Sequence, residues 1–169
     1  MIGLKCGLRD HELMHLGFRD INWTDKTLRV QSKDQWGFHP KTWEQREILI
    51  PDDLVAELAD WQKAREGQAL VLGTKNHKPN TKILRTLKRM AHRAGLSCGR
   101  CAGCRDVKEC QEFNLHRLRR TYLTTLFRSG IDLRTVQAYA GHKDLASTMR
   151  YLRSATGTEA QARLNAVEW

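Results

Sequence analysis

The chain has 169 residues, which suits one domain with a substantial core. Its 29 lysines and arginines exceed its 19 aspartates and glutamates, so the formal net charge is +10. No apolar run approaches the ~20 residues that span a bilayer, and no secretory signal is visible at the start. We therefore expect a cytoplasmic protein that binds a polyanion and no membrane.

The first third of the chain predicts one short helix and a small antiparallel sheet. Residues 12–20 have an apolar side, and residues 20–23 are expected to end that helix. Runs rich in β-forming residues predict strands at 27–31 and 46–50. The connection 32–45 carries three aromatic residues, and we expect at least one of them to pack on the sheet, although such residues could also contact DNA.

The remainder of the chain predicts mainly helices. Pro51 and the two aspartates after it favour a helix start, with the buried face expected at Leu54, Val55, Leu58 and Trp61. A short apolar strand or extended piece is expected at 69–73, followed by helices at 81–94, 113–129, 133–140, 145–152 and 159–167. The sequence thus predicts an α+β fold, mainly α-helical with a small antiparallel β-sheet.

Basic residues recur at helical spacing along the predicted helix 81–94. Positions 82, 85, 89 and 93 are all lysine or arginine, so they would form one basic stripe. This stripe indicates either a contact with nucleic acid or an ordinary solvated helix face.

Between residues 116 and 151 lie side chains suited to chemistry on a phosphodiester. His116 and Arg119 are three residues apart, so on a helix they share one face and could reach the same phosphate. A guanidinium offers a planar set of donors that fits phosphate oxygens, and an imidazole can move a proton near neutral pH. Gly141 suits a left-handed helix end, which would release His142 from the helix.

A tyrosine completes this set of residues. Asp144 is suited to cap a new helix, and Tyr151 lies about two turns into it. Because a phenol is a poor nucleophile until it loses its proton, it needs nearby cations or a base. The segment 116–142 offers both.

These motifs resemble the tyrosine recombinase (phage integrase) family over residues 5–155 or so. Residues 116–121 are similar to its His-x-Leu-Arg-x-Thr box, and Gly141–His142 with Tyr151 nine residues later is similar to its Gly-His dipeptide and tyrosine. Upstream, residues 7–13 are similar to Gly-Leu-Arg-x-x-Glu-Leu, in which Arg9 is the first catalytic arginine. Lys33 falls where the family places a catalytic lysine in a hairpin, although Lys26 and Lys41 lie nearby.

The resemblance implies a site-specific recombinase or integrase that breaks and rejoins double-stranded DNA. Tyr151 would attack the phosphodiester and become linked to the 3′-phosphate, freeing a 5′-hydroxyl. Arg9 and Arg119 would neutralise the transition state, and His116 would accept the tyrosine proton.

Three further roles follow from the resemblance. Lys33 would protonate the leaving 5′ oxygen, and His142 would hydrogen-bond the phosphate. Glu12 would orient His116 or an arginine rather than react. No metal or cofactor is implied for catalysis.

The resemblance also bears on origin, domains and partners, and it implies a bacterial, phage or mobile-element origin. Family members act as tetramers on DNA and carry an upstream DNA-clamping (core-binding) domain, so residues 1–169 are expected to be a single catalytic domain without that N-terminal part. An inactive DNA-binding fragment, a type IB topoisomerase-like enzyme and a metal-stabilised interaction module are the alternatives.

A dense group of cysteines departs from the family's pattern. Cys98, Cys101, Cys104 and Cys110 follow a C-x2-C-x2-C-x5-C spacing. Because intracellular chains rarely use disulfides, we expect residues 98–110 to be an inserted metal-binding loop. Structural Zn²⁺ is favoured over an iron–sulfur cluster, and four reduced thiols are the alternative.

Overall fold

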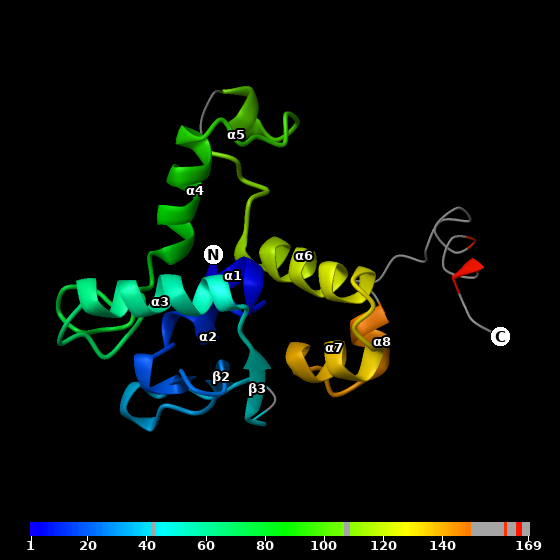
Figure 1. Cartoon of the computed structure of the whole chain (residues 1–169). Coiled ribbons are helices and arrows are strands. Elements are labelled where there is room, and N and C mark those ends of the chain that lie inside the picture. The colour runs from blue at the N-terminus through cyan, green and yellow to red at the C-terminus, as the bar shows by residue number, and fades with distance from the viewer. Residues whose placement is uncertain (42, 107–108, 150–160, 162–164, 167–169) are drawn as a thin grey trace.

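A computed structural model of the chain describes residues 1–41, 43–106, 109–149, 161 and 165–166. The described part is mainly helical with one small sheet, as predicted (Figure 1). Up to residue 64 the elements are α1 (Ile2–Lys5), α2 (Asp10–Met14), the 3₁₀ helix η1 (Phe18–Asp20), β1 (Ile21–Asn22), β2 (Thr27–Val30), the 3₁₀ helix η2 (Asp34–Trp36), β3 (Arg46–Leu49) and α3 (Asp52–Ala64). After it come α4 (Ile83–Arg93), α5 (Ala102–Arg105), α6 (Leu115–Arg128), α7 (Leu133–Ala140) and α8 (Leu145–Met149).

The sheet has three antiparallel strands in the order β1-β2-β3. β2 and β3 agree with the predicted strands to within one residue at each end. Helical structure ends at Asp20, as expected for residues 20–23, but the helix predicted over 12–20 is divided into α2 and η1. The strand β1 was not predicted: Ile21 and Asn22 pair with Leu28 and Thr27. A strand of two residues is too short to show an alternating pattern, so only its pairing partner reveals it.

The centre of the sheet supports the hydrophobic core. Leu28 and Ile48 lie opposite each other and are fully buried, together with Leu54 and Leu58 of α3. Trp61, expected on the same buried face, is 41% exposed, and its indole N–H donates to the Val71 carbonyl at 2.7 Å. A tryptophan is amphipathic enough to lie at such an edge.

The extended piece expected at 69–73 does not form a regular strand. A single bridge joins Leu70 to Gly17, and the Val71 N–H donates to the Leu16 carbonyl at 2.9 Å. Leu70 and Val71 are nevertheless buried, so their apolar character reflects packing rather than sheet pairing.

The predicted helices at 81–94, 113–129 and 133–140 correspond to α4, α6 and α7 within two residues at each end. The prediction for 145–152 is confirmed as far as Met149, and most of 159–167 lies outside the described residues. Figure 1 shows α4 leading from the level of α3 up to α5, from which the chain returns to α6. No helix in the described part of the chain has the length and apolar character to cross a membrane.

One of the three aromatic residues of the connection 32–45 is buried, as expected. Phe38 stacks on His15 with ring centroids 4.6 Å apart and is 7% exposed. Trp43 is 72% exposed and stacks on His39.

We expect Leu28→Ala to lower the free energy of unfolding by about 2–5 kcal/mol, because it removes buried methyl groups and leaves a cavity. Leu49→Ala on β3 is the matched control, because Leu49 is 57% exposed and should cost less than about 1 kcal/mol. Urea unfolding of the two variants checks this. Equal losses in both would contradict the placement of the core.

Candidate active site

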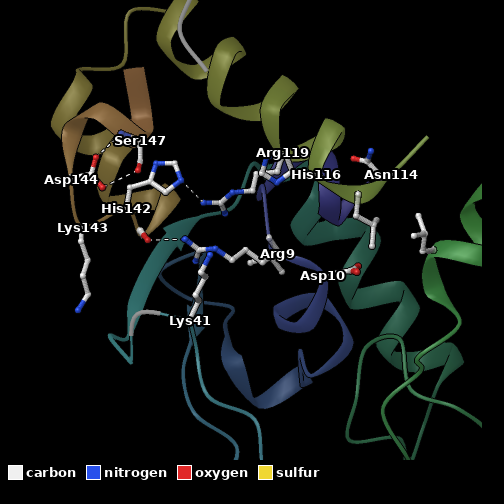
Figure 2. Close-up of a pocket in the computed structure, with 14 residues that line it drawn as sticks. Arg9, Asp10, Lys41, Asn114, His116, Arg119, His142, Lys143, Asp144 and Ser147 are labelled. Atoms are coloured by element: carbon white, nitrogen blue, oxygen red, sulfur yellow. Dashed lines mark hydrogen bonds between the residues drawn. The ribbon is translucent and has the colours of Figure 1, made fainter. Parts of the chain in front are cut away.

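A cavity of about 810 Å³ lies where the start of α2, the start of α6 and the segment after α7 meet. Its lining includes four of the residues singled out by sequence, and we call these four the cationic cradle: Arg9, His116, Arg119 and His142. Figure 2 shows these side chains around one hollow, with Arg9 and Arg119 reaching toward the segment that carries His142. Segments more than 100 residues apart in sequence therefore form one site.

Arg119 is the most buried member of the cationic cradle, with 1% of its surface exposed. Its guanidinium donates to the Gly7 carbonyl at 2.6 Å and to the Ala140 carbonyl, and it lies 3.3 Å from His142 Nε2. Gly7 has φ +58°, and a Cβ there would overlap the Tyr122 ring, so glycine is required where this carbonyl faces Arg119. A charge buried in this way needs such hydrogen bonds to offset its desolvation.

Arg9 is held from two sides. Its Nη1 donates to Glu12 Oε1 at 2.8 Å, and its Nη2 donates to the Gly141 carbonyl at 2.8 Å. Its side chain is 21% exposed, so it remains accessible from the cavity. Glu12 was expected to orient either His116 or an arginine, and its contact with Arg9 supports the second role.

The Glu12 carboxylate also binds Arg46, a residue that no sequence motif had singled out. Arg46 Nη1 and Nη2 donate to the two carboxylate oxygens at 2.9 and 2.7 Å, and Arg46 Nε donates to the Tyr139 carbonyl at 2.9 Å. Burial alone would raise the pKa of Glu12. The hydrogen bonds and charge of Arg46, and to a lesser extent those of Arg9, instead lower it to about 2.

His116 lies on the first turn of α6, on the same side as Arg119, as its spacing predicts. Asn114, rather than His116, caps the helix, because Asn114 Oδ1 accepts from the Arg117 N–H at 3.0 Å. Burial, followed by the positive charges of Arg119, Arg120 and Arg9, lowers the pKa of His116. His116 thus favours its neutral form, which can accept a proton.

His142 follows the left-handed Gly141 (φ 57°, ψ 48°), as predicted for this helix end. Its Nδ1 lies 3.0 Å from Thr148 Oγ1, and its Nε2 faces Arg119. Burial first, and then the charges of Arg119 and Arg9, lower the pKa of His142 to about 4. The ring is therefore neutral near physiological pH.

Lys33 does not line this cavity. Its ammonium pairs with the buried Asp20 carboxylate, and its backbone pairs with Phe38 at the end of a small hairpin. Lys41, one of the two nearby lysines, does lie at the cavity wall. Figure 2 shows Lys41 on the same side of the cavity as Lys143.

The structure describes the segment that leads to Tyr151 as far as Met149, the last residue of α8. Asp144 accepts hydrogen bonds from the Ser147 N–H and hydroxyl at 2.7 and 2.8 Å, which confirms Asp144 as the cap. Tyr151 itself lies outside the described residues.

Sequence reasoning missed the contributions of Arg46, Thr148 and Asp10 to this region. Asp10 lines the cavity and has one buried carboxylate oxygen that no described residue hydrogen-bonds. Arg46 occupies an inward position of β3, where alternation with the buried Ile48 predicts a core-facing residue. A charged residue at an inward strand position is the signal that could have identified Arg46.

The four clustered cysteines come together at the far end of α4. Their sulfur atoms all lie within 4.8 Å of one another, so the cluster can hold a metal ion. Cys98 Sγ and Cys104 Sγ are 3.8 Å apart. Cys110 is buried, and the chain continues from it to Asn114, the cap of α6.

Comparison with known proteins shows which sequence family the chain matches. The sequence model described as "Phage integrase family" matches residues 1–157. The tyrosine recombinase XerA of Pyrococcus furiosus is 28% identical over 153 residues, which cover 87% of this chain and 46% of that protein. The chain thus spans about half the length of this curated relative.

Solved structures share the fold. The Tn1549 transposon integrase, solved in complex with a circular intermediate DNA, has a TM-score of 0.73 and 21% identity over 98% of this chain and 56% of that chain. A lambda integrase dimer bound to a core site has a TM-score of 0.62 and 19% identity, covering 89% of this chain and 39% of that one.

The lowered pKa of His142 predicts a pH-dependent stability. Between its ordinary pKa of 6.5 and about 4, the unfolded chain binds more protons at His142 than the folded chain does. The free energy of unfolding should therefore fall as pH decreases through this window, and His142→Gln should reduce the slope. Urea unfolding at about pH 7 and pH 5 measures this, and an equal or steeper slope in the variant would contradict it.

Proposed function

The chain belongs to the phage integrase family, and we propose that it is the catalytic domain of a recombinase that cuts and rejoins double-stranded DNA through a 3′-phosphotyrosine. The observation that carries this proposal is the cationic cradle, in which two guanidinium groups and two imidazoles surround one cavity of about 810 Å³. Charges that are already in place when the transition state forms stabilise it without reorganisation.

In the proposed reaction, Tyr151 Oη forms a bond to the scissile phosphorus while the bond to the 5′ oxygen breaks. His116, whose pKa is lowered, accepts the phenolic proton. Arg9 and Arg119 bind the phosphate oxygens. His142 donates a hydrogen bond to one of them through Nε2, which requires the tautomer protonated at Nε2 and the phosphate in place of the Arg119 contact. The covalent link retains the energy of the broken bond, so the strand can be rejoined by the reverse attack of a 5′-hydroxyl.

The leaving 5′ oxygen must receive a proton, for which we propose Lys33. Lys33 would have to leave Asp20 to do so, because this ion pair holds it away from the cavity wall. Lys41 lies at that wall and is the alternative donor.

We propose DNA as the partner, within the cell and with assembly of several copies on it. The net charge of +10 and the exposed basic residues on α4 support a polyanionic partner. The Tn1549 and lambda integrases were solved on DNA, the latter as a dimer, and a tetramer is the assembly we expect for the whole enzyme.

We further propose that the cysteine cluster binds structural Zn²⁺. A tetrahedral Zn²⁺ with bonds of ~2.3 Å to sulfur separates its ligands by about 3.8 Å, which is the distance between Cys98 Sγ and Cys104 Sγ. Four protein ligands leave no position for a substrate. The ion would fix the segment from Cys110 to Asn114, which leads into α6. Lys88 Nζ, which donates to the Gln111 carbonyl at 3.2 Å, would connect this segment to α4.

Tyr151→Phe should abolish covalent protein–DNA adducts on a nicked duplex that traps the cleaved strand, because the phenol oxygen forms the bond. Tyr139→Phe is the matched control, because it removes only a different phenol oxygen and should still form adducts. Denaturing gels detect the products. Adducts in Tyr151→Phe would contradict the assignment, whereas salt-dependent DNA binding without adducts in the wild type would favour an inactive DNA-binding fragment.

Elemental analysis of the purified chain should find one zinc ion per chain, and Cys104→Ser should lose it because three thiolates bind more weakly than four. Cys6→Ala is the control, because Cys6 is the one cysteine outside the cluster and should leave the zinc content unchanged. Iron with visible absorption would indicate an iron–sulfur cluster. A chain without metal would favour reduced thiols.

A further inference from the structure

We propose that Arg46 is a positioning residue, which shares the Glu12 carboxylate with Arg9 and so keeps part of the Arg9 guanidinium available to a phosphate. This inference rests on the proposed function, in which Arg9 binds the scissile phosphate. Arg46 itself does not line the cavity, so its effect must pass through Glu12 and Arg9.

The hydrogen bonds around Glu12 show how the carboxylate is shared. Oε1 accepts from Arg46 Nη1 at 2.9 Å and from Arg9 Nη1 at 2.8 Å. Oε2 accepts from Arg46 Nη2 at 2.7 Å and from the Arg9 backbone N–H at 2.7 Å. A carboxylate has about four acceptor sites, so this one is fully used.

The two arginines differ in exposure, and this difference separates their roles. The side chain of Arg46 is 7% exposed and that of Glu12 is 2% exposed, whereas that of Arg9 is 21% exposed. Arg46 is thus the buried, bidentate partner of the Glu12 carboxylate. Arg9 contributes one side-chain N–H to Glu12 and one to the Gly141 carbonyl, and it faces the cavity.

Removal of Arg46 would leave Glu12 buried with a single cation. A poorly paired buried charge is costly, so the carboxylate would draw the Arg9 guanidinium into the bidentate contact that Arg46 had made. The pKa of Glu12 supports this view, because Arg46 is the largest of the influences that lower it to about 2 against the effect of burial. Arg9 would then lose its orientation toward the phosphate.

Arg46 also contacts the helix end to which Arg9 donates. Arg46 Nε donates to the Tyr139 carbonyl, two residues before the Gly141 carbonyl that accepts from Arg9. A Cβ on Gly141 would lie 3.1 Å from Arg46 Cδ, so the helix end packs closely on this arginine. Arg46 thus contacts both the Glu12 carboxylate and the helix end that carries the Gly141 carbonyl.

The test compares Arg46→Met, Arg46→Lys and the double variant Arg46→Met/Glu12→Gln for DNA affinity and for single-turnover cleavage at saturating DNA. Arg46→Met should cleave ~100-fold more slowly, the scale of losing one preorganised donor, with DNA affinity nearly unchanged. The double variant should recover at least ~10-fold, because an uncharged amide in place of the Glu12 carboxylate no longer draws Arg9 away. Arg29→Met, which breaks the exposed Arg29–Glu47 pair on the other face of the sheet, is the control and should cleave normally.

Recovery in the double variant is the outcome that a purely structural role would not produce. The inference is overturned if Arg46→Met cleaves at the wild-type rate, or if the double variant is as slow as the single one. Should Arg46→Met fail to fold, Arg46→Lys tests the positioning role instead, because a lysine keeps the charge but not the bidentate contact. It should cleave about 10-fold more slowly, and wild-type cleavage would overturn the inference.

A second measurement separates this inference from the proposed function. The NMR signal of the Arg9 side-chain N–H is followed as a nicked DNA duplex is added. We expect a shift in the wild type, loss of the shift in Arg46→Met and its return in the double variant. If the wild type forms no adduct, the proposed function fails, and the NMR result alone decides the role of Arg46. In that case, an unchanged shift in Arg46→Met would overturn the positioning role of Arg46.

Discussion

Three arginines bind the C-terminal end of α7, and the site depends on this arrangement. Arg46, Arg119 and Arg9 donate to the carbonyls of three consecutive residues, 139, 140 and 141 respectively. The last carbonyls of a helix have no partner within the helix and carry the negative end of its dipole, so they suit cations. Each guanidinium is thereby oriented by a backbone atom whose position is fixed by the fold.

This arrangement joins parts of the chain that are remote in sequence. Arg9 comes from the start of α2, Arg46 from β3 and Arg119 from α6, and only the completed fold brings them to one helix end. Because the guanidinium groups are ordered before any ligand arrives, binding a phosphate requires little further ordering. The same contacts fix Gly141, after which the chain turns toward His142 and α8.

Local patterns predicted much of the fold and of the site. Apolar spacing located α3 and α4, and the extents of α6 and α7 were also predicted. The three-residue spacing of His116 and Arg119 placed both on one wall of the cavity. The pairing of Lys33 with Asp20 and of Arg46 with Glu12 could not be predicted, because contacts between residues 13 and 34 positions apart leave no periodic signal. The two-residue strand β1 was missed for the same reason, since it is defined by its partner.

We propose that the cationic cradle, with its two guanidinium groups and two neutral imidazoles, prepares Tyr151 to form a bond to DNA. The most direct measurement is mass spectrometry of the peptide that remains attached to DNA after cleavage of a nicked duplex and digestion of the protein. We expect a nucleotide joined through its 3′-phosphate to the oxygen of Tyr151. Attachment at any other residue, or through a 5′-phosphate, would contradict it.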